Sequence, residues 1–329
     1  MECAYCSSHW CSAEANLGEM FVRLLYLAGL AVGVVSLVAL LGGSFWAFDL
    51  MSHFRVQYFG LLVLSGAILV VLKQRKKAGV LGSFAAFNIF LILPLFTGGG
   101  GVHAAASEGM SQRLMSVNLL SSNENTEATF AVVAEANPDV VLFLEVNDWW
   151  QSRLNERFAS DYPFHDSRPR EDNFGMSLYS KRPFEDFEVL HLGDEIPTMR
   201  VTFPNQGKPF HLFGVHFLPP MGKRGTAHRD AAFADLPAAI SNLPHEIIVV
   251  GDLNATPWSY PFRRLLAVTK LQDSSAGFGF QPTWPTFLSV MSIPIDHCLH
   301  TSGVQILNRA VGKEMGSDHL PLIVDFQLR

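Results

Sequence analysis

The sequence predicts an α/β fold: a four-layer α/β sandwich, in which two packed mixed β-sheets are flanked by helices, preceded by three transmembrane helices. Uncharged apolar stretches fill much of the first hundred residues, and strand and helix patterns alternate after residue 110. A glycine-rich segment separates these two regions. The chain of 329 residues is 49% hydrophobic with a mean hydropathy of +0.21, which is high for a wholly soluble protein.

The apolar stretches cover residues 24–48, 56–72 and 80–96, and each approaches the length needed to cross about 30 Å of hydrocarbon. A signal peptide is the alternative for the first stretch, but that stretch is too long and two more follow. Arg23 and the segment Lys73–Lys77 belong on the cytoplasmic side by the positive-inside bias. We therefore expect a multi-pass protein of the cytoplasmic (inner) membrane, with its C-terminal domain periplasmic or extracellular.

The expected organisation has four parts. They are an N-terminal cytoplasmic tail at 1–22, a three-helix membrane anchor at 23–97, a flexible linker at 98–109 and a folded domain at 110–329.

The tail contains a dense group of potential metal ligands, namely Cys3, Cys6, His9 and Cys11. The stretch that begins at Met20 also resembles a chain start, with one basic residue before an apolar run. Both interpretations of residues 1–19, a metal site and a dispensable segment, stay open.

Charge separates the C-terminal domain from proteins that bind bulk nucleic acid. Residues 110–329 hold 18 Lys and Arg against 25 Asp and Glu, a net charge of −7. Nucleic-acid binding depends on basic surface, so nucleic acid is a possible partner that the charge does not favour. The sequence indicates the lipid bilayer as a partner, through the three helices, and shows no sign of an obligate protein partner.

After residue 110 the predicted elements alternate. Residues 126–137 are expected to be helical, because Thr126 stands at the start and Asn137–Pro138 ends the pattern. Residues 139–146 are a continuous apolar run, as in a strand buried on both faces. By the same criteria we expect helices at 149–158, 229–243 and 262–270, and strands at 113–120, 175–184, 187–193, 197–204, 210–220, 246–254, 294–301, 304–311 and 320–328.

Polar or ionisable residues stand at the ends of several of these apolar strands, where an unpaired polar group costs a few kcal/mol. They are Asn118, Glu145, His216, Asp252, Asn254, Asp296, Asp318 and His319. One such residue is usually held by a structural hydrogen bond, whereas so many strand ends together indicate that the side chains meet. We therefore expect one cleft at the edge of two stacked sheets.

The residue types in this set favour one kind of chemistry. Carboxylates and carboxamides suit Mg²⁺ or Mn²⁺ better than zinc or copper. Histidines titrate near neutral pH, and a carboxylate can hold a histidine in one tautomer. A hard metal and such a histidine are the equipment for attacking a phosphate ester with water, because the metal neutralises phosphoryl charge and fixed donors stabilise the transition state.

The order of these residues resembles the endonuclease/exonuclease/phosphatase superfamily, which has the deoxyribonuclease I-like fold. The motifs that carry the resemblance are GDLNATP at 251–257 and GSDHLPL at 316–322, and it covers about residues 110–329. It implies a metal-dependent phosphoric ester hydrolase of the phosphodiesterase, nuclease or phosphatase class. Several bacterial members carry membrane anchors, so the chain resembles a membrane-anchored bacterial member.

The resemblance also implies roles for single residues. Glu145 would be the principal metal ligand, helped by Asn118, and Asp318 would bind or support the metal. Asp296 would orient His319. The nucleophilic water would be activated by Asp252 or by His319, and the sequence does not decide between them.

The remaining implied roles concern the substrate. Asn254 would hold a phosphate oxygen through its amide, and His216 would contact the phosphate or assist the leaving group. The favoured substrate is a lipid headgroup or another small phosphorylated molecule on the outer side of the membrane. The alternatives are an extracytoplasmic nuclease and a catalytically silent, membrane-displayed binding module. The substrate, the number of metals and the oligomeric state are not fixed by the sequence.

Overall fold

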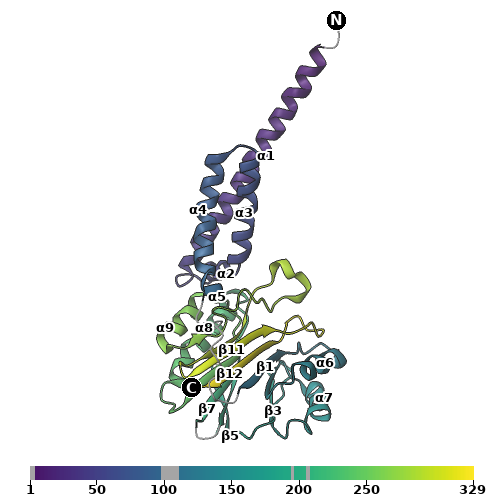
Figure 1. Ribbon diagram of the computed structural model, residues 1–329, viewed down its shortest axis with the longest axis vertical. Coiled ribbons are helices and arrows are strands. Elements are labelled where there is room, and N and C mark those ends of the chain that lie inside the picture. The colour runs from purple at the N-terminus through teal and green to yellow at the C-terminus, as the bar shows by residue number, and fades with distance from the viewer. Residues whose placement is uncertain (1–3, 98–110, 194–195, 205–207) are drawn as a thin grey trace. The chain divides into compact units, whose positions relative to one another are not determined.

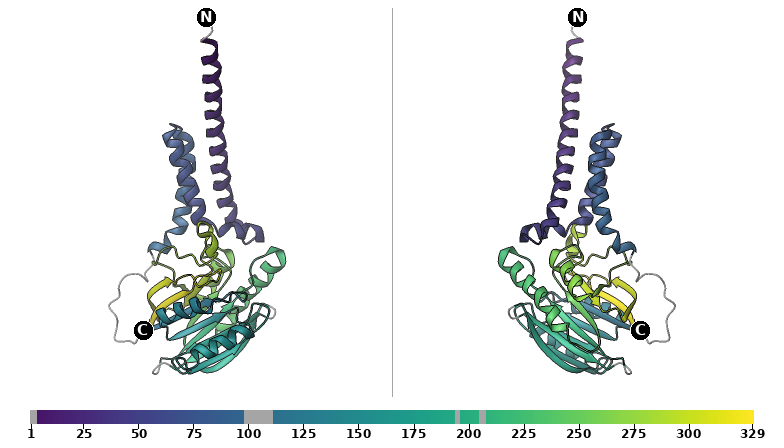
Figure 2. Two further views of the ribbon diagram at one scale, coloured as in Figure 1. Left: turned by 90° about the vertical axis from the view of Figure 1, so that its right-hand side faces the viewer. Right: turned by 90° about the vertical axis from the view of Figure 1, so that its left-hand side faces the viewer.

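The computed structural model describes residues 4–97, 111–193, 196–204 and 208–329, with side chains from residue 16 onward. The chain divides into two compact units, Met1–Leu93 and Pro94–Arg329, here called the helical unit and the C-terminal unit. Figures 1 and 2 show the helices of the first and the strands of the second. The tail cysteines, His9 and the linker 98–109 lie outside the residues, or the side chains, that are described.

The helical unit consists of four α-helices and one turn of 3₁₀-helix. They are α1 (Ala4–Val38), η1 (Ala39–Leu41), α2 (Trp46–Ser52), α3 (Arg55–Val71) and α4 (Arg75–Ile92). Small residues let α1 approach α4 closely, since a Cβ atom added at Gly29 would lie 2.6 Å from Leu81 and one at Gly33 would lie 2.5 Å from Phe84. Buried apolar side chains such as Leu62 and Leu81 form the core between the helices.

The expectation of three membrane-spanning helices is wrong by length and composition. Among the described residues one helix qualifies as a span, at Asn16–Leu41. A second qualifies only if α2 and α3, bent by 62° at their junction, count as one broken span. The reason for the difference is that α3 has 17 residues and α4 begins with the basic triplet Arg75–Lys77, so that neither is a long uncharged helix by itself.

Buried polar contacts join the helices of this unit. Arg55, expected in an external loop, begins α3 and is 1% exposed. Its guanidinium donates to the backbone carbonyl of Ser36 and lies 3.4 Å from Oδ1 of Asn88. The amide of Asn88 in turn donates to the Ser36 hydroxyl at 3.1 Å. Polar side chains from three helices therefore satisfy one another inside the helical unit.

The C-terminal unit begins with the short helix α5 (Pro94–Thr97) and contains two six-stranded sheets. The first has the strand order β11-β12-β1-β2-β4-β3, and the second has the order β5-β6-β7-β8-β10-β9. The pairs β1–β2 and β7–β8 are parallel and their other neighbours are antiparallel, so both sheets are mixed, as predicted.

The bounds of the strands follow from the order of the chain. They are β1 (Gln112–Asn118), β2 (Val140–Leu144), β3 (Phe164–Arg168), β4 (Met176–Ser180), β5 (Glu185–Leu192), β6 (Ile196–Phe203), β7 (Phe210–His216), β8 (Glu246–Asp252), β9 (Gln272–Asp273), β10 (Asp296–His300), β11 (Val304–Val311) and β12 (Leu322–Leu328).

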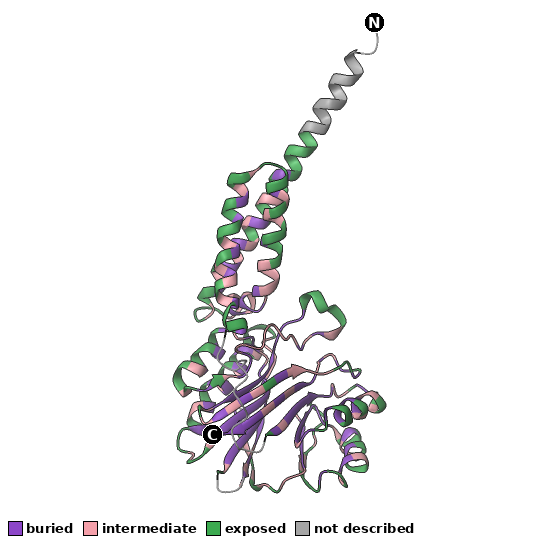
Figure 3. Cartoon of the chain, in the orientation of Figure 1, coloured by how far each residue is buried: buried purple, intermediate pink, exposed green. Residues whose placement is uncertain are grey.

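Helices cover the outer face of each sheet, which makes the predicted four layers. They are α6 (Thr126–Ala136) and α7 (Asp148–Phe158) on the first sheet, and α8 (Gly222–Ile240) and α9 (Tyr260–Thr269) on the second. A 3₁₀ segment, η3 (Thr286–Met291), lies between β9 and β10. Figure 3 shows the strands of both sheets as mostly buried.

Three apolar cores hold these layers together. Leu142 of β2 and Ile248 of β8 belong to the core between the sheets, and both are fully buried. Trp150 of α7 packs in the outer core of the first sheet, while Phe262 of α9 packs in that of the second. The side chains of β2 and β8 point alternately into two cores, which explains why their sequences are continuous apolar runs.

Candidate active site

The polar residues singled out in the sequence follow the ends of neighbouring strands. Asn118 is the last residue of β1, and Glu145 directly follows β2. His216 and Asp252 are the last residues of β7 and β8, and they face each other in the ladder between these parallel strands. Because parallel strands end at the same edge of a sheet, one short turn after each strand brings its polar side chain to that edge.

Antiparallel pairing brings a third strand to the same place. Asp296 begins β10 and is the ladder partner of Asp252, so three neighbouring strands set His216, Asp252 and Asp296 side by side. His319 comes from the connection between β11 and β12, in the first sheet. The site is therefore built from both sheets, as the sequence predicted.

A hydrogen-bonded pair forms the centre of the site. Nδ1 of His319 lies 2.8 Å from Oδ2 of Asp296, and both residues are at most 5% exposed. Nε2 of His319 lies 3.7 Å from Oδ2 of Asp252. The predicted orientation of His319 by Asp296 has the geometry it requires, with the second ring nitrogen directed towards Asp252.

Electrostatics set opposite protonation preferences in this group. Burial opposes a charge on His319, but the charge and hydrogen bond of Asp296, with help from Asp252, outweigh burial and raise the pKa of His319 to about 10. Burial and the nearby charge of Asp296 raise the pKa of Asp252 well above its usual value. Burial also acts on Asp296, but the His319 cation lowers the pKa of Asp296 overall.

His216 completes the second-sheet side. Its Nε2 lies 3.7 Å from Oδ2 of Asp252, the same distance that separates His319 from this oxygen. Burial and the His319 charge lower the pKa of His216 to about 4, so the ring is neutral at physiological pH. The ring of Phe174 lies 5.0 Å from that of His216 and screens it from water on one side.

Asn254 holds Asp252 in place. Its backbone N–H donates to Oδ1 of Asp252 at 2.7 Å, and its amide lies 3.3 Å from Oδ2 of the same carboxylate. The amide also donates to the carbonyl of Phe217 at 2.8 Å. Asn254 has a φ of +47°, a conformation that favours asparagine among larger residues. The predicted contact of its amide with a phosphate oxygen stays a prediction.

Gly251 has a spatial role beside Asp252. Its φ is +138°, and a Cβ atom added there would lie 2.0 Å from the carbonyl oxygen of Val215 on β7. A side chain at this position would push β7 and β8 apart. The glycine therefore keeps His216 and Asp252 level in their ladder.

Glu145, Asn118 and Asp318 form the other side of the site. Glu145 is 8% exposed, has a φ of +60°, and accepts a hydrogen bond from the backbone N–H of Ser121 at 3.1 Å. Burial is the main cause of the raised pKa of Glu145, against the donors of Ser121 and Asn118, which favour its charged form. Asp318 and His319 also act electrostatically on Glu145, which shows that the two sides adjoin.

Unsatisfied polar atoms on this side suit a cation. Oδ1 of Asp318 is buried and has no hydrogen-bond partner among the described residues, while Oδ2 accepts from Nε1 of Trp284 at 2.9 Å. Nδ2 of Asn118 also lacks a partner of normal geometry, and Oδ1 accepts from the Leu120 N–H at 3.1 Å, which leaves one lone pair. Two carboxylates and a carboxamide are the oxygen ligands that Mg²⁺ and Mn²⁺ take.

A different group satisfies a simple distance test for metal binding. Asp252, Asp296 and His319 place one potential ligand atom each within 4.8 Å of the others. In this structure Nδ1 of His319 is bonded to Asp296, and the raised pKa keeps the ring protonated at neutral pH. A protonated imidazole has no lone pair for a metal, so this group is better suited to proton transfer than to coordination.

Several residues that support the site were not found from the sequence as supports. Arg229 is fully buried, and its guanidinium donates to the carbonyl of Asn254 at 3.3 Å and to Asp230 at 2.9 Å. The sequence placed it in a mobile loop over the site, but α8 begins at Gly222 and carries Arg229 inward. The signal that was available is amphipathic: Arg229, Ala232 and Phe233 are buried at helical spacing.

The comparisons place this fold among known proteins. The model of the Endonuclease/Exonuclease/phosphatase family matches residues 115–319, from the start of β1 to His319. The chain belongs to this family. A comparison with curated protein sequences finds no match.

Solved structures of this family's fold resemble the chain at low sequence identity. An endonuclease/exonuclease/phosphatase from Beutenbergia cavernae is 19% identical with a TM-score of 0.54, covering 66% of this chain and 72% of that one. TDP2 from D. rerio, complexed with a single-strand DNA product, is 16% identical with a TM-score of 0.55, covering 66% and 99%. Sphingomyelinase C from Streptomyces griseocarneus is 18% identical with a TM-score of 0.51, covering 66% and 99%.

Proposed function

We propose that the protein is a membrane-anchored phosphoesterase, dependent on Mg²⁺ or Mn²⁺, that hydrolyses a phosphodiester or phosphomonoester. The observation that carries the proposal is the Asp296–His319–Asp252 arrangement, with 2.8 Å and 3.7 Å between the facing atoms, at the same strand ends as Glu145. Structural neighbours in this fold include a sphingomyelinase and a protein bound to a DNA product, which support phosphoester chemistry.

Glu145, Asn118 and Asp318 are the residues that would hold the metal, because they combine oxygen donors with unsatisfied buried atoms. When bound, a divalent cation neutralises negative charge on the phosphoryl oxygens and on the leaving oxygen.

The proton of the attacking water passes to Asp252 in this proposal. The raised pKa of Asp252 brings its carboxylate closer to neutral pH, where a general base works best. His319 is protonated at neutral pH, so it acts as a cation that stabilises the developing charge and is not the first proton acceptor. Asp296 and Asn254 fix the orientations of His319 and Asp252, respectively.

We propose that α1 anchors the protein, and that the C-terminal unit lies on the outer side of the membrane. The candidate span Asn16–Leu41 has 26 residues, which reach about 39 Å as a helix, more than one hydrocarbon core. An odd number of crossings from a cytoplasmic N-terminus gives this orientation. Protease digestion of the C-terminal unit in sealed cells tests it, since two crossings would leave this unit protected inside.

The enzymatic proposal is tested with the purified full chain in detergent. With Mg²⁺ it should hydrolyse bis(p-nitrophenyl) phosphate, and EDTA should abolish the reaction. A parallel panel of phospholipid, sugar phosphate, nucleotide and DNA separates lipid or small-molecule hydrolysis from the nuclease alternative. A protein that hydrolyses no phosphoester with either metal would instead be the silent binding module.

A further inference from the structure

The segment η3 exposes apolar side chains side by side. Phe287 is 78% exposed, Val290 73%, Leu288 46% and Met291 39%. Figure 1 shows the yellow-green loop that contains this segment projecting from the C-terminal unit, and Figure 3 shows much of that loop as exposed. Single exposed apolar residues are normal on protein surfaces, whereas four in six consecutive residues mark a contact surface. We call Phe287, Leu288, Val290 and Met291 the apolar tip.

The apolar tip is attached directly to the catalytic motif. The backbone N–H of Thr286 donates to the carbonyl of Asp318 at 3.0 Å, and its hydroxyl donates to the carbonyl of Ser317 at 3.0 Å. The indole of Trp284 donates to Asp318 and lies with its ring centroid 6.5 Å from that of His319. The residue that precedes the tip is therefore bonded to the two residues that precede His319.

A second exposed apolar residue stands near the His216 side. Met221 is 79% exposed and lines an open hollow of about 430 Å³. Phe174 lines the same hollow and contacts the ring of His216. Arg170 and Arg224 also border this hollow, which gives it cationic groups beside apolar ones. Both catalytic histidines therefore have an exposed apolar residue on a neighbouring segment.

The composition of the tip favours lipid over a protein partner. No charged residue occurs between Thr283 and Ile295, a segment of aromatic, aliphatic, hydroxyl and proline residues. Protein interfaces surround their apolar centre with charged and amide groups, while interfacial membrane segments combine Phe, Leu and Trp. The chain also contains a candidate membrane span, so a bilayer is the apolar phase available to the molecule.

We propose that the apolar tip inserts into a lipid surface and that the site acts on the phosphoester of a lipid headgroup presented there. This inference rests on the proposed function and specifies its substrate class. Insertion of Phe287 and Val290 would hold His319 and Asp252 at the level of the headgroups, because the tip is bonded to the Ser317–Asp318 turn.

A lipid-contact experiment tests the insertion without any need for activity. The full chain carrying Phe287→Trp is reconstituted into phosphatidylcholine vesicles with brominated acyl chains, and its added fluorescence is measured against the parent protein. Phe164→Trp is the matched control, since Phe164 is 38% exposed on β3, an edge strand of the first sheet. We expect bromine to quench the added emission at position 287 and not at 164. Equal quenching at both positions, or none at 287, overturns insertion.

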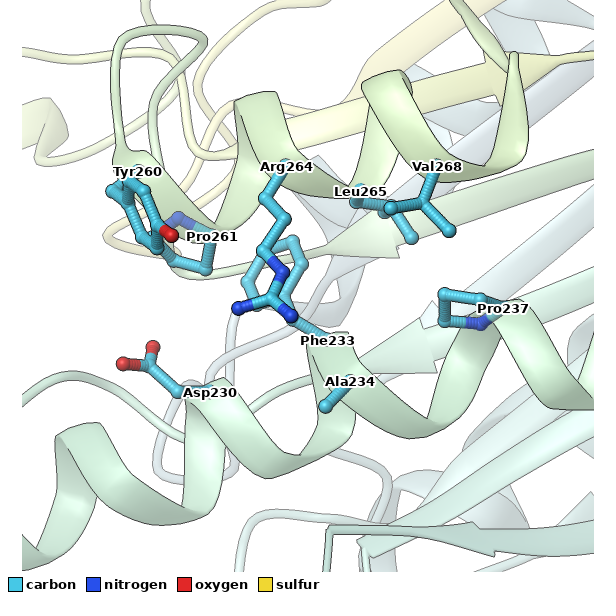
Figure 4. A pocket seen from close by; sticks show the side chains of 9 residues that line it. All are labelled: Asp230, Phe233, Ala234, Pro237, Tyr260, Pro261, Arg264, Leu265 and Val268. Atoms are coloured by element: carbon cyan, nitrogen blue, oxygen red, sulfur yellow. The ribbon is translucent and has the colours of Figure 1, made fainter. Parts of the chain in front are cut away.

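A kinetic experiment tests the substrate class. Vesicles of phosphatidylcholine, phosphatidylethanolamine, phosphatidylglycerol and sphingomyelin supply headgroup phosphoesters, and bis(p-nitrophenyl) phosphate is the soluble reference. The double variant Phe287→Ser/Val290→Ser should lower the ratio of lipid to soluble hydrolysis at least tenfold. Val268→Ser is the control, because Val268 is 60% exposed on α9 in the groove that α8 and α9 form, shown in Figure 4, away from the catalytic residues.

The outcomes separate this inference from the proposed function. An unchanged ratio in the double variant, with soluble hydrolysis intact in the parent, overturns the lipid inference alone. Parent protein that hydrolyses neither substrate with Mg²⁺ or Mn²⁺ overturns both the enzymatic proposal and the substrate class, and the quenching result still decides insertion. A Phe287→Trp emission shift without quenching, together with loss of self-association in the double variant, identifies a second copy as the occupant and overturns the lipid surface.

Discussion

The two sheets of the C-terminal unit each contribute one parallel β-α-β segment, and these segments end in different chemistry. The β1–α6–β2 segment ends at Asn118 and Glu145, whose polar atoms are incompletely satisfied. The β7–α8–β8 segment ends at His216 and Asp252, next to Asp296 and His319. The first side suits an added cation, while the second side carries its own. One architecture thus provides a metal-binding side and a proton-transfer side.

The largest expected effect breaks the proton-transfer side. Asp252→Asn should lower the turnover of bis(p-nitrophenyl) phosphate by about 10²–10⁴-fold, the range for loss of a general base. Thermal stability should not fall, because burial disfavours the charged carboxylate that the amide replaces. Asp161→Asn is the control, since Asp161 has a side chain 57% exposed at the end of α7. Wild-type turnover in Asp252→Asn would exclude Asp252 as the proton acceptor.

The next largest effect separates the two sides. Glu145→Gln should raise the Mg²⁺ concentration for half-maximal activity by about 100-fold, because it removes the principal ligand charge. His319→Gln should lower turnover and leave that Mg²⁺ concentration within a few-fold of wild type. Titration of activity with Mg²⁺ measures both. Similar shifts in the two variants would indicate that the buried Asp252–Asp296–His319 group binds the metal.

A pH experiment sharpens the proton-transfer side. The pKa of His319 is raised from 6.5 to about 10, so its charge stabilises the fold fully below pH 6.5, and this contribution is lost as pH rises towards 10. Melting temperatures of the full chain in EDTA should therefore fall between pH 7 and 10. Asp296→Asn removes the partner that raises this pKa, so the fall should move to lower pH. Identical profiles for both proteins would contradict the proposed role of Asp296.

The smallest expected effect concerns Arg229, which acts through Asn254. Arg229→Lys keeps the charge but loses the planar guanidinium, so the Asn254 carbonyl loses a fixed donor. We expect turnover to fall about tenfold with little change in KM, less than the hundredfold that a 1 Å misplacement can cause. The Mg²⁺ requirement should stay unchanged, and a raised requirement would place Arg229 on the metal side instead.

The sequence predicted the four-layer sandwich because its strongest signals are local. Apolar runs such as 139–146 are buried between two cores, and Asn137 ends α6 in a left-handed conformation directly before Pro138. The strand-end positions of the site residues could be predicted for the same reason, since polar residues such as Asp252 interrupt apolar runs. Their roles as ligands, bases and donors remain predictions.

Other features depend on long-range contacts that a single sequence does not display. Burial of Arg55 requires Ser36 and Asn88, which lie 19 and 33 residues away. The edge strand β3 has exposed and half-buried residues throughout, and so lacks an apolar pattern. The expected third span failed because the basic triplet Arg75–Lys77 is part of α4 and does not form a loop before it.

Gly251 carries a consequence for genetics. It holds no proton, binds no substrate and contributes no side chain, yet a single methyl group there would collide with the carbonyl of Val215. A random mutagenesis screen should therefore recover inactive alleles at position 251 as readily as at the charged positions around it. Such alleles would look like damage to the chemistry while every reactive group remained in the polypeptide.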